Sequence, residues 1–179
     1  LFASDARSPH LSAEQLKASR ASYPAVPAVC VVTGGTGFVG ARLVEMLVER
    51  GASQLVLTSR SGMAVPGSES ELVALLEAQN ISAYACDASC ASQVTHIARR
   101  LLGLNERVRG IFHAAGVLAD AALANQSRPR FAAVFGPKVH GAQAFHSNTL
   151  LADVRNFEVY SSMAALLGAA GQAPHSAAC

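Results

Sequence analysis

The feature that most constrains this chain is a cluster of glycines at the junction of an apolar stretch and a helical pattern. Residues 28–32 are apolar and rich in β-branched side chains, and amphipathic periodicity runs over residues 38–50. Gly35, Gly37 and Gly40 stand at the junction with the spacing G-x-G-x-x-G. In this setting Gly35 permits a sharp turn, Gly37 lets backbone approach a pyrophosphate, and Gly40 lets the helix pack closely on the strand. The pattern predicts a dinucleotide-binding turn; the alternative is a glycine-rich turn that merely joins strand to helix.

The start of that helix is where phosphates are expected to bind. Its first N–H groups have no partner within the helix, and they carry the positive end of the helix dipole, which attracts anions. To this cradle we assign Thr33, Gly34, Gly35, Thr36, Gly37, Phe38, Val39 and Gly40.

The rest of the chain alternates between strand and helix patterns. Strands are predicted at residues 28–33, 54–59, 81–86, 108–113 and 156–160, and helices at 38–50, 69–79, 90–102 and 128–148. This order predicts an α/β fold, a Rossmann-type doubly wound parallel sheet with right-handed crossovers. Such folds usually have six strands, so the pattern predicts a sheet truncated after the fifth strand.

Local signals refine the ends of these elements. Gly136-Pro137 interrupts the last helical pattern, and proline is expected to kink that helix or restart it. Ser89 is the candidate N-cap of the helix at 90–102. The small residues between Tyr160 and Cys179 predict a loop.

The chain divides into two predicted parts. Residues 1–27 show only a short helical pattern at 12–21 and are predicted to be a linker or interdomain segment. Residues 28–179 are predicted to form one nucleotide-binding domain. Because the first residue is Leu, we expect the chain to be a piece of a longer polypeptide.

Composition limits the classes of function. The sequence is 51% hydrophobic and 15% charged, which suits a parallel sheet covered on both faces. The net charge is +2 and no block of Lys or Arg stands out, so neither nucleic acid nor a membrane surface is predicted as a partner. The sequence has no run of 18 uninterrupted apolar residues and no signal-peptide pattern.

The cysteines indicate a reducing compartment. Cys30, Cys86, Cys90 and Cys179 form no CxxC pair and no zinc spacing, so no metal site is predicted. We expect buried free thiols and a cytoplasmic location.

The end of the second predicted strand favours NADP over NAD. An NAD site would have an acidic residue there for the ribose hydroxyl, but this sequence has Ser59-Arg60. A guanidinium and a neighbouring hydroxyl suit a 2′-phosphate, although Arg60 could also be an ordinary exposed arginine. Asp87 ends the third strand, where it could meet the adenine or serve as a turn residue.

With these residues in place, the chain resembles the short-chain dehydrogenase/reductase superfamily. More narrowly, it is similar to the ketoreductase domain of modular polyketide synthases and multifunctional fatty acid synthases. The matching motifs are Thr33-Gly-Gly-Thr-Gly-Phe-Val-Gly40, Ser59-Arg60, Cys86-Asp87, His113-Ala-Ala-Gly116-Val-Leu, Pro137-Lys138-Val139-x-Gly141 and Ser161-Ser162-Met163 with Gly168-x-x-Gly171-Gln172. The resemblance implies further NADP(H) contacts at Ser59, Arg60, Asp87, Ala88, Ala114, Ala115, Gly116 and Lys138.

The resemblance also implies a catalytic set with two departures. In the family a serine orients a substrate carbonyl, a tyrosine protonates it, a lysine lowers the tyrosine pKa, and an asparagine completes a proton relay. Ser162 and Lys138 match their positions, but His175 and Cys179 stand where the tyrosine and asparagine are expected. His175 could donate a proton, yet its nitrogens reach less far than a tyrosine hydroxyl, and the Lys138 charge disfavours imidazolium.

Two further residues take roles from the resemblance. Asp120, in Leu118-Ala119-Asp120, marks the B-type of ketoreductase, and no Trp lies between Ser162 and Gln172. The alternative is a solvated loop carboxylate. His113 is expected to brace the loop under the nicotinamide rather than to catalyse.

Three functions remain open from the sequence. The first is an NADPH-dependent β-ketoacyl reductase domain, acting on a substrate held by an acyl carrier protein beside other domains of a synthase. The second is a catalytically impaired NADP(H)-binding structural domain of the same assembly. The third is an epimerase-like extended reductase, which requires a Tyr-x-x-x-Lys pair after the Ser-Ser strand that this sequence lacks.

Overall fold

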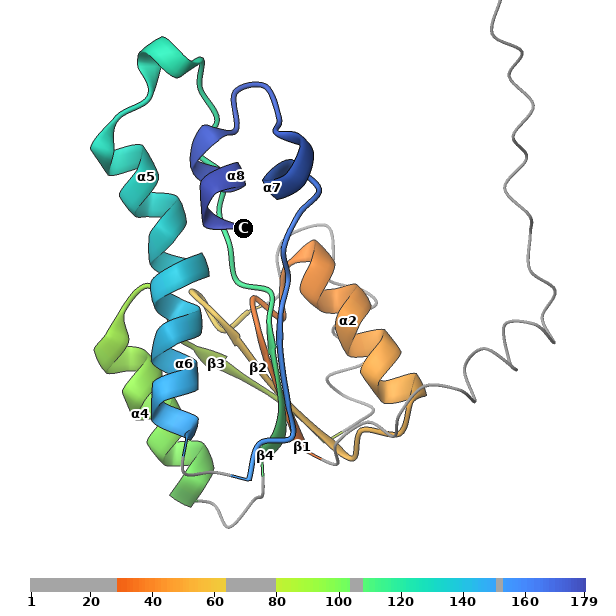
Figure 1. Ribbon diagram of the computed structural model, residues 1–179. Helices are drawn as coiled ribbons and strands as arrows, with labels where there is room; N and C mark the ends of the chain where they lie inside the picture. Colours follow the sequence, from red (N-terminus) through yellow and green to blue (C-terminus); the bar gives the residue numbers. More distant parts are fainter. Residues whose placement is uncertain (1–28, 64–79, 104–107, 151–152) are drawn as a thin grey trace, which may run out of the picture.

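The computed structural model describes residues 29–63, 80–103, 108–150 and 153–179 (Figure 1). The predicted linker at 1–27 and the predicted helix at 69–79 lie outside the described residues.

Five parallel strands form one sheet in the order β3-β2-β1-β4-β5. Their bounds are Val29–Thr33 (β1), Gln54–Ser59 (β2), Ile81–Ala85 (β3), Val108–His113 (β4) and Asn156–Val159 (β5). Every predicted strand is present, and its ends agree with the structure to within one residue. The strand order reverses between β1 and β4, which opens a crevice at their carboxyl ends.

Helices cover both faces of this sheet. Figure 1 shows α2 on one face and α4 with α6 on the other, the doubly wound arrangement that the alternation predicts. The helical segments are Phe38–Glu49 (α2), Ala91–Gly103 (α4), Leu123–Asn125 (η1), Arg128–Phe135 (α5), Gly136–His140 (η2), Gly141–Thr149 (α6), Ala164–Leu167 (α7) and Ala173–Ala178 (α8). None of the helices that the structure describes is both long and apolar enough to cross a membrane.

Alternation along β1 divides the core into two halves. Cys30 and Val32 pack with Leu43 and Leu47 of α2, whereas Val31 faces the opposite layer. That second layer contains Val56, Val94, Ile97, Leu101, Ile111 and Phe145. Both faces of the central strands are therefore buried, as the apolar composition predicts.

One expectation about the carboxyl-terminal part is corrected and another is confirmed. The segment after β5 is not a loop throughout, because α7 and α8 form there and lie above the carboxyl end of the sheet (Figure 1). Pro174 at the start of α8 suits a first helical turn, where its missing N–H costs nothing. The predicted interruption at Gly136-Pro137 is confirmed: α5 ends at Phe135, and a π turn, η2, with Pro137 in its first turn, carries the chain into α6.

The predicted N-cap at Ser89 is also wrong. Helix α4 begins at Ala91, and the Ser89 hydroxyl donates instead to the Asp87 carboxylate at 2.7 Å.

The four thiols are free, but only two of them are buried. Cys30 and Cys86 lie in the core, whereas Cys90 and Cys179 are partly exposed. Burial raises the pKa of Cys30 to about 12 and that of Cys86 to about 11, so both stay protonated near neutral pH.

This difference predicts selective labelling of the native chain. Iodoacetamide at neutral pH should modify Cys90 and Cys179, while Cys30 and Cys86 should react only after unfolding, because thiolate and access are both needed. Peptide mass spectrometry before and after denaturation measures this. Equal labelling of all four thiols in the native protein would contradict the burial of the two core cysteines.

A matched pair of leucines tests the core. Leu57 in β2 is 0% exposed and Leu166 in α7 is 81% exposed. Leu57→Ala should lower the free energy of unfolding by about 2–5 kcal/mol, because it removes buried methyl groups and leaves a cavity. Leu166→Ala should change it by less than about 0.5 kcal/mol. Urea unfolding followed by circular dichroism measures both, and equal losses would contradict this core.

Candidate functional site

The glycine turn after β1 is fixed by backbone hydrogen bonds to the neighbouring strand β2. The Gly34 and Gly35 N–H groups donate to the Thr58 carbonyl at 2.7 and 3.2 Å, and the Gly37 N–H donates to the Gly34 carbonyl at 3.0 Å. Gly34 has φ +68°, the left-handed region that favours glycine. The turn is thus held against the end of β2 before α2 begins.

Close backbone approach explains why glycine recurs in this turn. A Cβ on Gly34 would lie 2.9 Å from the Ala114 carbonyl oxygen, and one on Gly40 would overlap the Gly34 carbonyl. Gly37 differs, since a Cβ there would meet only the Gly34 oxygen, at 3.3 Å. Its missing side chain therefore leaves the outer side of the turn open.

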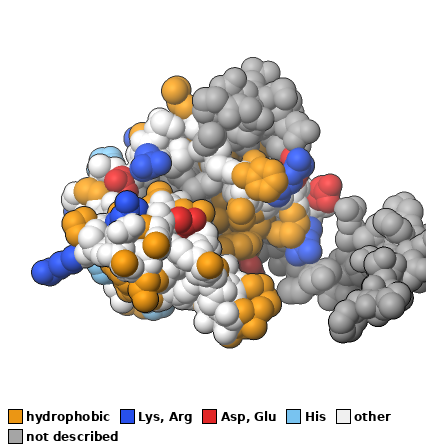
Figure 2. All heavy atoms as spheres, turned by 90° about the horizontal axis from the view of Figure 1, so that it is seen from above, with side chains coloured by type: hydrophobic (Ala, Val, Ile, Leu, Met, Phe, Trp, Pro, Cys, Tyr) orange, Lys and Arg blue, Asp and Glu red, His pale blue; other side chains and the backbone are white. Residues whose placement is uncertain are grey.

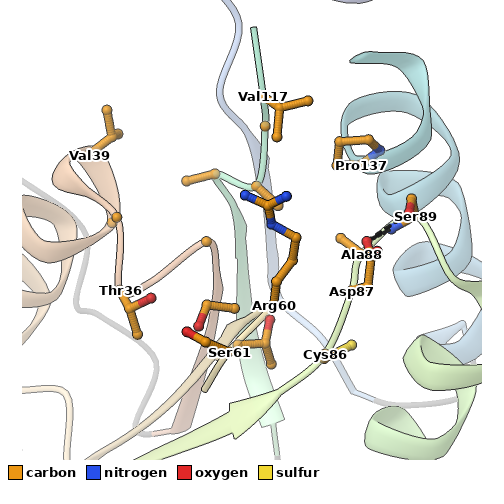
Figure 3. A pocket seen from close by; sticks show the side chains of 18 of the residues that line it. Thr36, Val39, Arg60, Ser61, Cys86, Asp87, Ala88, Ser89, Val117 and Pro137 are labelled. Atoms are coloured by element: carbon orange, nitrogen blue, oxygen red, sulfur yellow. Dashed lines mark hydrogen bonds between the residues drawn. The ribbon is translucent and has the colours of Figure 1, made fainter. Parts of the chain in front are cut away.

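A cavity of about 840 Å³ lies beside this turn, along the carboxyl ends of the central strands (Figure 3). It is lined by predicted cofactor residues from four segments: Gly34, Thr36, Gly37, Phe38, Val39, Gly40, Ser59, Arg60, Asp87, Ala88, Ala114, Ala115 and Gly116. Thr33 and Gly35 are buried and are not among the lining residues.

Sequence reasoning missed part of the lining. Ser61, Val117, Ala133 and Pro137 also contact the cavity, and Figure 3 shows Pro137 across from Val39. Ala133 and Pro137 come from α5 and η2, far along the chain from the glycine turn. Small apolar residues in a helical pattern give no signal of such a role.

The residues present fit a dinucleotide. The helix α2 has no side-chain N-cap and no acidic residue in its first turn, so its first N–H groups remain available to an anion. The cavity volume also falls within the usual range for ligand sites, about 300–1,000 Å³. The described residues contain no group of three His, Cys, Asp or Glu side chains that could hold a metal ion.

Arg60 and Asp87 stand at the ends of β2 and β3 within this cavity. Figure 3 shows the Arg60 side chain rising into it, and the residue is exposed. The Asp87 carboxylate accepts from the Ser89 hydroxyl and N–H, at 2.7 and 2.9 Å. These bonds, with a smaller contribution from the Arg60 charge, lower the pKa of Asp87. Asp87 is therefore a turn residue that also lines the cavity.

Lys138 lies beside the cavity, on the π turn. Its Nζ donates to the Tyr160 carbonyl at 3.3 Å. A Cβ on Gly116 would lie 3.2 Å from Lys138 Cε, so the glycine leaves room for the lysine stem. Lys138 thus bridges the segments that follow β4 and β5.

The remaining predicted catalytic residues lie outside the cavity lining, near the carboxyl-terminal helices. The Ser162 hydroxyl accepts from the Ala164 N–H at 3.1 Å at the start of α7. His175 and Cys179 lie one turn apart, with the Cys179 sulfur 3.7 and 3.8 Å from the two ring nitrogens. Among the described residues, no hydrogen bond joins Ser162, Lys138 and His175 to one another.

Asp120 is tied to the other side of this region. Its carboxylate accepts from the Gln172 amide at 2.9 Å, and the Ala121 N–H donates to the Gly171 carbonyl at 2.9 Å. The segment after β4 is therefore fastened to the segment between α7 and α8. This contact joins residues 52 positions apart, which no local pattern predicts.

The surface over this edge of the sheet is mixed in character. Figure 2 shows basic, acidic and hydrophobic side chains interspersed over the described part of the face. Three exposed apolar side chains come from α7 and the residue before it: Met163, Leu166 and Leu167.

Comparison with known proteins places this site in a family. The KR domain family matches residues 28–179. A phenolphthiocerol synthesis polyketide synthase type I from Mycobacterium marinum is 40% identical over 153 residues, covering 84% of this chain and 7% of that protein. A protein from Mycobacterium tuberculosis named "Putative inactive phenolphthiocerol synthesis polyketide synthase type I Pks1" is 37% identical over 150 residues, covering 83% of this chain and 9% of that protein.

A solved structure gives the same answer. Described as "Structure of A-type Ketoreductases from Modular Polyketide Synthase", it superposes with a TM-score of 0.77 at 36% identity. The match covers 88% of this chain and 34% of that one. The chain thus spans a small part of its curated relatives and about a third of the solved ketoreductase.

The parallel sheet with its glycine turn, the family match and the similarity to solved ketoreductases agree, and the chain belongs to the KR domain family, the ketoreductase domains of polyketide synthases.

Proposed function

We propose that this chain is the NADPH-binding part of a ketoreductase that reduces a β-ketoacyl thioester to a β-hydroxyacyl thioester. The observation that carries the proposal is the cavity in which an uncapped helix start, a glycine turn and Arg60 meet at the strand ends. Family membership supplies the reaction class. The expected substrate is carried by an acyl carrier protein, beside other domains of a polyketide synthase.

The preference for NADPH depends on the end of β2. An NAD site needs a carboxylate there for the ribose hydroxyls, and β2 ends in Ser59 followed by Arg60. The nearest carboxylate lining the cavity, Asp87, already accepts two hydrogen bonds from Ser89. The exposed Arg60 guanidinium can fork onto phosphate oxygens, which favours the 2′-phosphate.

The chemistry divides between cofactor and chain. When bound, the cofactor supplies the hydride, and the chain has to orient the carbonyl, stabilise negative charge on its oxygen and deliver a proton there. We assign orientation to the Ser162 hydroxyl and charge stabilisation to Lys138. The proton donor is expected at residue 175, where this chain carries His175 with Cys179 one turn later.

Those two residues support the alternative, an NADP(H)-binding structural domain without turnover. The cavity and Lys138 are intact, but His175 contacts Cys179 rather than Ser162 or Lys138 among the described residues. Loss of a general acid lowers the rate by about 10²–10⁴ while leaving cofactor binding largely intact.

The stereochemical course remains a prediction. Asp120 favours the B-type reaction, which gives the D-configured hydroxyl, and its carboxylate accepts a hydrogen bond from the Gln172 amide. The product configuration from an active form of the chain, resolved by chiral chromatography, tests this assignment.

Arg60→Ala should weaken NADPH binding by about tenfold or more and leave NADH binding nearly unchanged. Hydrogen bonds to a charged group contribute about 1.5–3 kcal/mol, and only NADPH carries the 2′-phosphate. Fluorescence titration of the full chain with each cofactor measures both affinities. Arg42→Ala is the control, because Arg42 is an exposed arginine paired with Glu45 on α2, outside the cavity lining. Equal losses for NADPH and NADH would remove the NADP assignment.

A second experiment separates the enzyme from the structural domain. The full chain is titrated with NADPH and then assayed on a β-ketoacyl thioester. Turnover by the natural sequence supports the enzyme, and binding without turnover supports the structural domain.

Restoring the family's residues should raise reductase activity. The double variant His175→Tyr with Cys179→Asn should increase turnover by about 10²–10⁴, the usual contribution of a general acid. Lys138→Met in the same background is the matched control and should return activity to the baseline. A double variant that binds NADPH but stays inert would place the defect elsewhere in the chain.

A further inference from the structure

A buried histidine joins the glycine turn to the segment that carries Lys138. His113 and Thr33 are the last residues of the adjacent strands β4 and β1, and they are paired in register. Their side chains therefore point to the same face of the sheet. His113 is 2% exposed and Thr33 is 0% exposed.

The hydrogen bonds around this pair favour one tautomer of the His113 ring. His113 Nε2 lies 2.8 Å from the Pro137 carbonyl oxygen, which can only accept, so Nε2 carries the hydrogen. The Thr33 hydroxyl accepts from the Ala115 N–H at 3.2 Å and lies 2.9 Å from His113 Nδ1. Because a neutral imidazole with Nε2–H has a lone pair on Nδ1, the Thr33 hydroxyl donates to it.

The other protonation states fit less well. A proton on Nδ1 alone would leave the Nε2 lone pair facing the Pro137 oxygen. An imidazolium would leave the Thr33 hydroxyl proton without this acceptor and would bury a charge near the Lys138 ammonium. Burial is the main cause that lowers the pKa of His113, and hydrogen bonding to the Pro137 and Lys138 backbone opposes it. The ring is accordingly neutral.

Pro137 and Lys138 are consecutive residues of the same π turn, η2. The Gly141 N–H donates to the Gly136 carbonyl, five residues earlier, the pattern of a π turn. A Cβ on Gly141 would lie 3.2 Å from His113 Cε1, so glycine there lets α6 lie against the ring. The imidazole is therefore hydrogen-bonded to the backbone of the π turn at Pro137, the residue directly before Lys138.

A second set of hydrogen bonds links the His113 main chain to the Lys138 ammonium through Tyr160. The His113 carbonyl accepts from the Tyr160 N–H at 3.2 Å, and the Tyr160 carbonyl accepts from Lys138 Nζ at 3.3 Å. The side chain of His113 thus fixes the backbone beside Lys138, while its main chain fixes the acceptor of the ammonium.

We propose that Thr33 and His113 form a positioning pair that places the Lys138 ammonium relative to the cofactor cavity, with His113 acting through its Nε2–H bond to Pro137. Neither side chain lines the cavity, so both act through Lys138 and the backbone. The proposal rests on the proposed function only in taking Lys138 as the cation that serves the cofactor and substrate.

Two amide substitutions test the roles of the two His113 ring nitrogens separately. The amide of His113→Asn reaches about as far as Nδ1 and keeps only the Thr33 side, whereas that of His113→Gln reaches about as far as Nε2 and can still donate to Pro137. Lys17 and Lys138 are the only lysines in the chain. Reductive ¹³C-methylation therefore gives two lysine signals by NMR, and Lys138→Met identifies one of them.

We expect the Lys138 signal of the cofactor-free chain to stay in place in His113→Gln and to move in His113→Asn. Because the glycine turn is untouched, any loss of NADPH affinity in either variant should be no larger than the loss in Lys138→Met. If an active form is available, kcat should fall about tenfold in His113→Asn and be rescued in His113→Gln, with KM little changed. A Lys138 signal that is the same in all forms, or that moves equally in both variants, would overturn the proposal.

A second measurement remains decisive if a His113 variant fails to fold. Ring ¹⁵N spectra of the natural chain near pH 7 should show neutral His113 protonated on Nε2. Thr33→Val should shift the Nδ1 signal and the Lys138 signal, and Thr33→Ser, which keeps the hydroxyl, should shift neither. A proton on Nδ1, or identical spectra for the Val and Ser variants, would contradict the pairing. Failure to bind NADPH with these spectra as expected would overturn the proposed function but not the pair.

Discussion

The close approach of the turn after β1 to the chain that follows β4 is the constraint on which the rest of this structure depends. Gly34 lies so near Ala114 and Ala115 that no side chain fits between them. That approach is possible because β1 and β4 are adjacent parallel strands that end at the same level, Thr33 beside His113. The cavity, the uncapped start of α2 and the position of Gly116 all follow from this junction.

The same junction links binding to chemistry. On its outer side lie the residues that line the cavity, and beneath it lie Thr33 and His113, which are hydrogen-bonded to each other. His113 also donates to the Pro137 carbonyl. The π turn at Gly136–His140 places Lys138 alongside Gly116 instead of continuing a regular helix. A buried polar pair is costly unless each donor and acceptor is satisfied, and here the proton positions satisfy all of them.

The carboxyl-terminal helices are less tightly joined to this centre. Ser162, His175 and Cys179 lie in or beside α7 and α8, whose apolar residues Leu166 and Leu167 are largely exposed. The contacts described there run from Asp120 to Gln172 and from Ser161 to the Cys179 carbonyl. The cavity proposed to hold the cofactor is lined by described residues of the central strands and their neighbours, whereas the predicted proton donor is a histidine that contacts a cysteine.

The sequence by itself determined the strands, the doubly wound arrangement and the glycine turn, because period-two and period-3.6 patterns and glycine spacing are local properties. It also predicted roles for Arg60 and Lys138, since both stand at fixed offsets from recognisable motifs. Only the tertiary structure decided that residues 128–149 run through a π turn, that α7 and α8 form, and that Asp87 holds Ser89 rather than standing free. It alone paired Thr33 with His113 and Asp120 with Gln172, contacts between residues 80 and 52 positions apart. Such contacts depend on how strands and loops are brought together in space, which no pattern along the chain encodes.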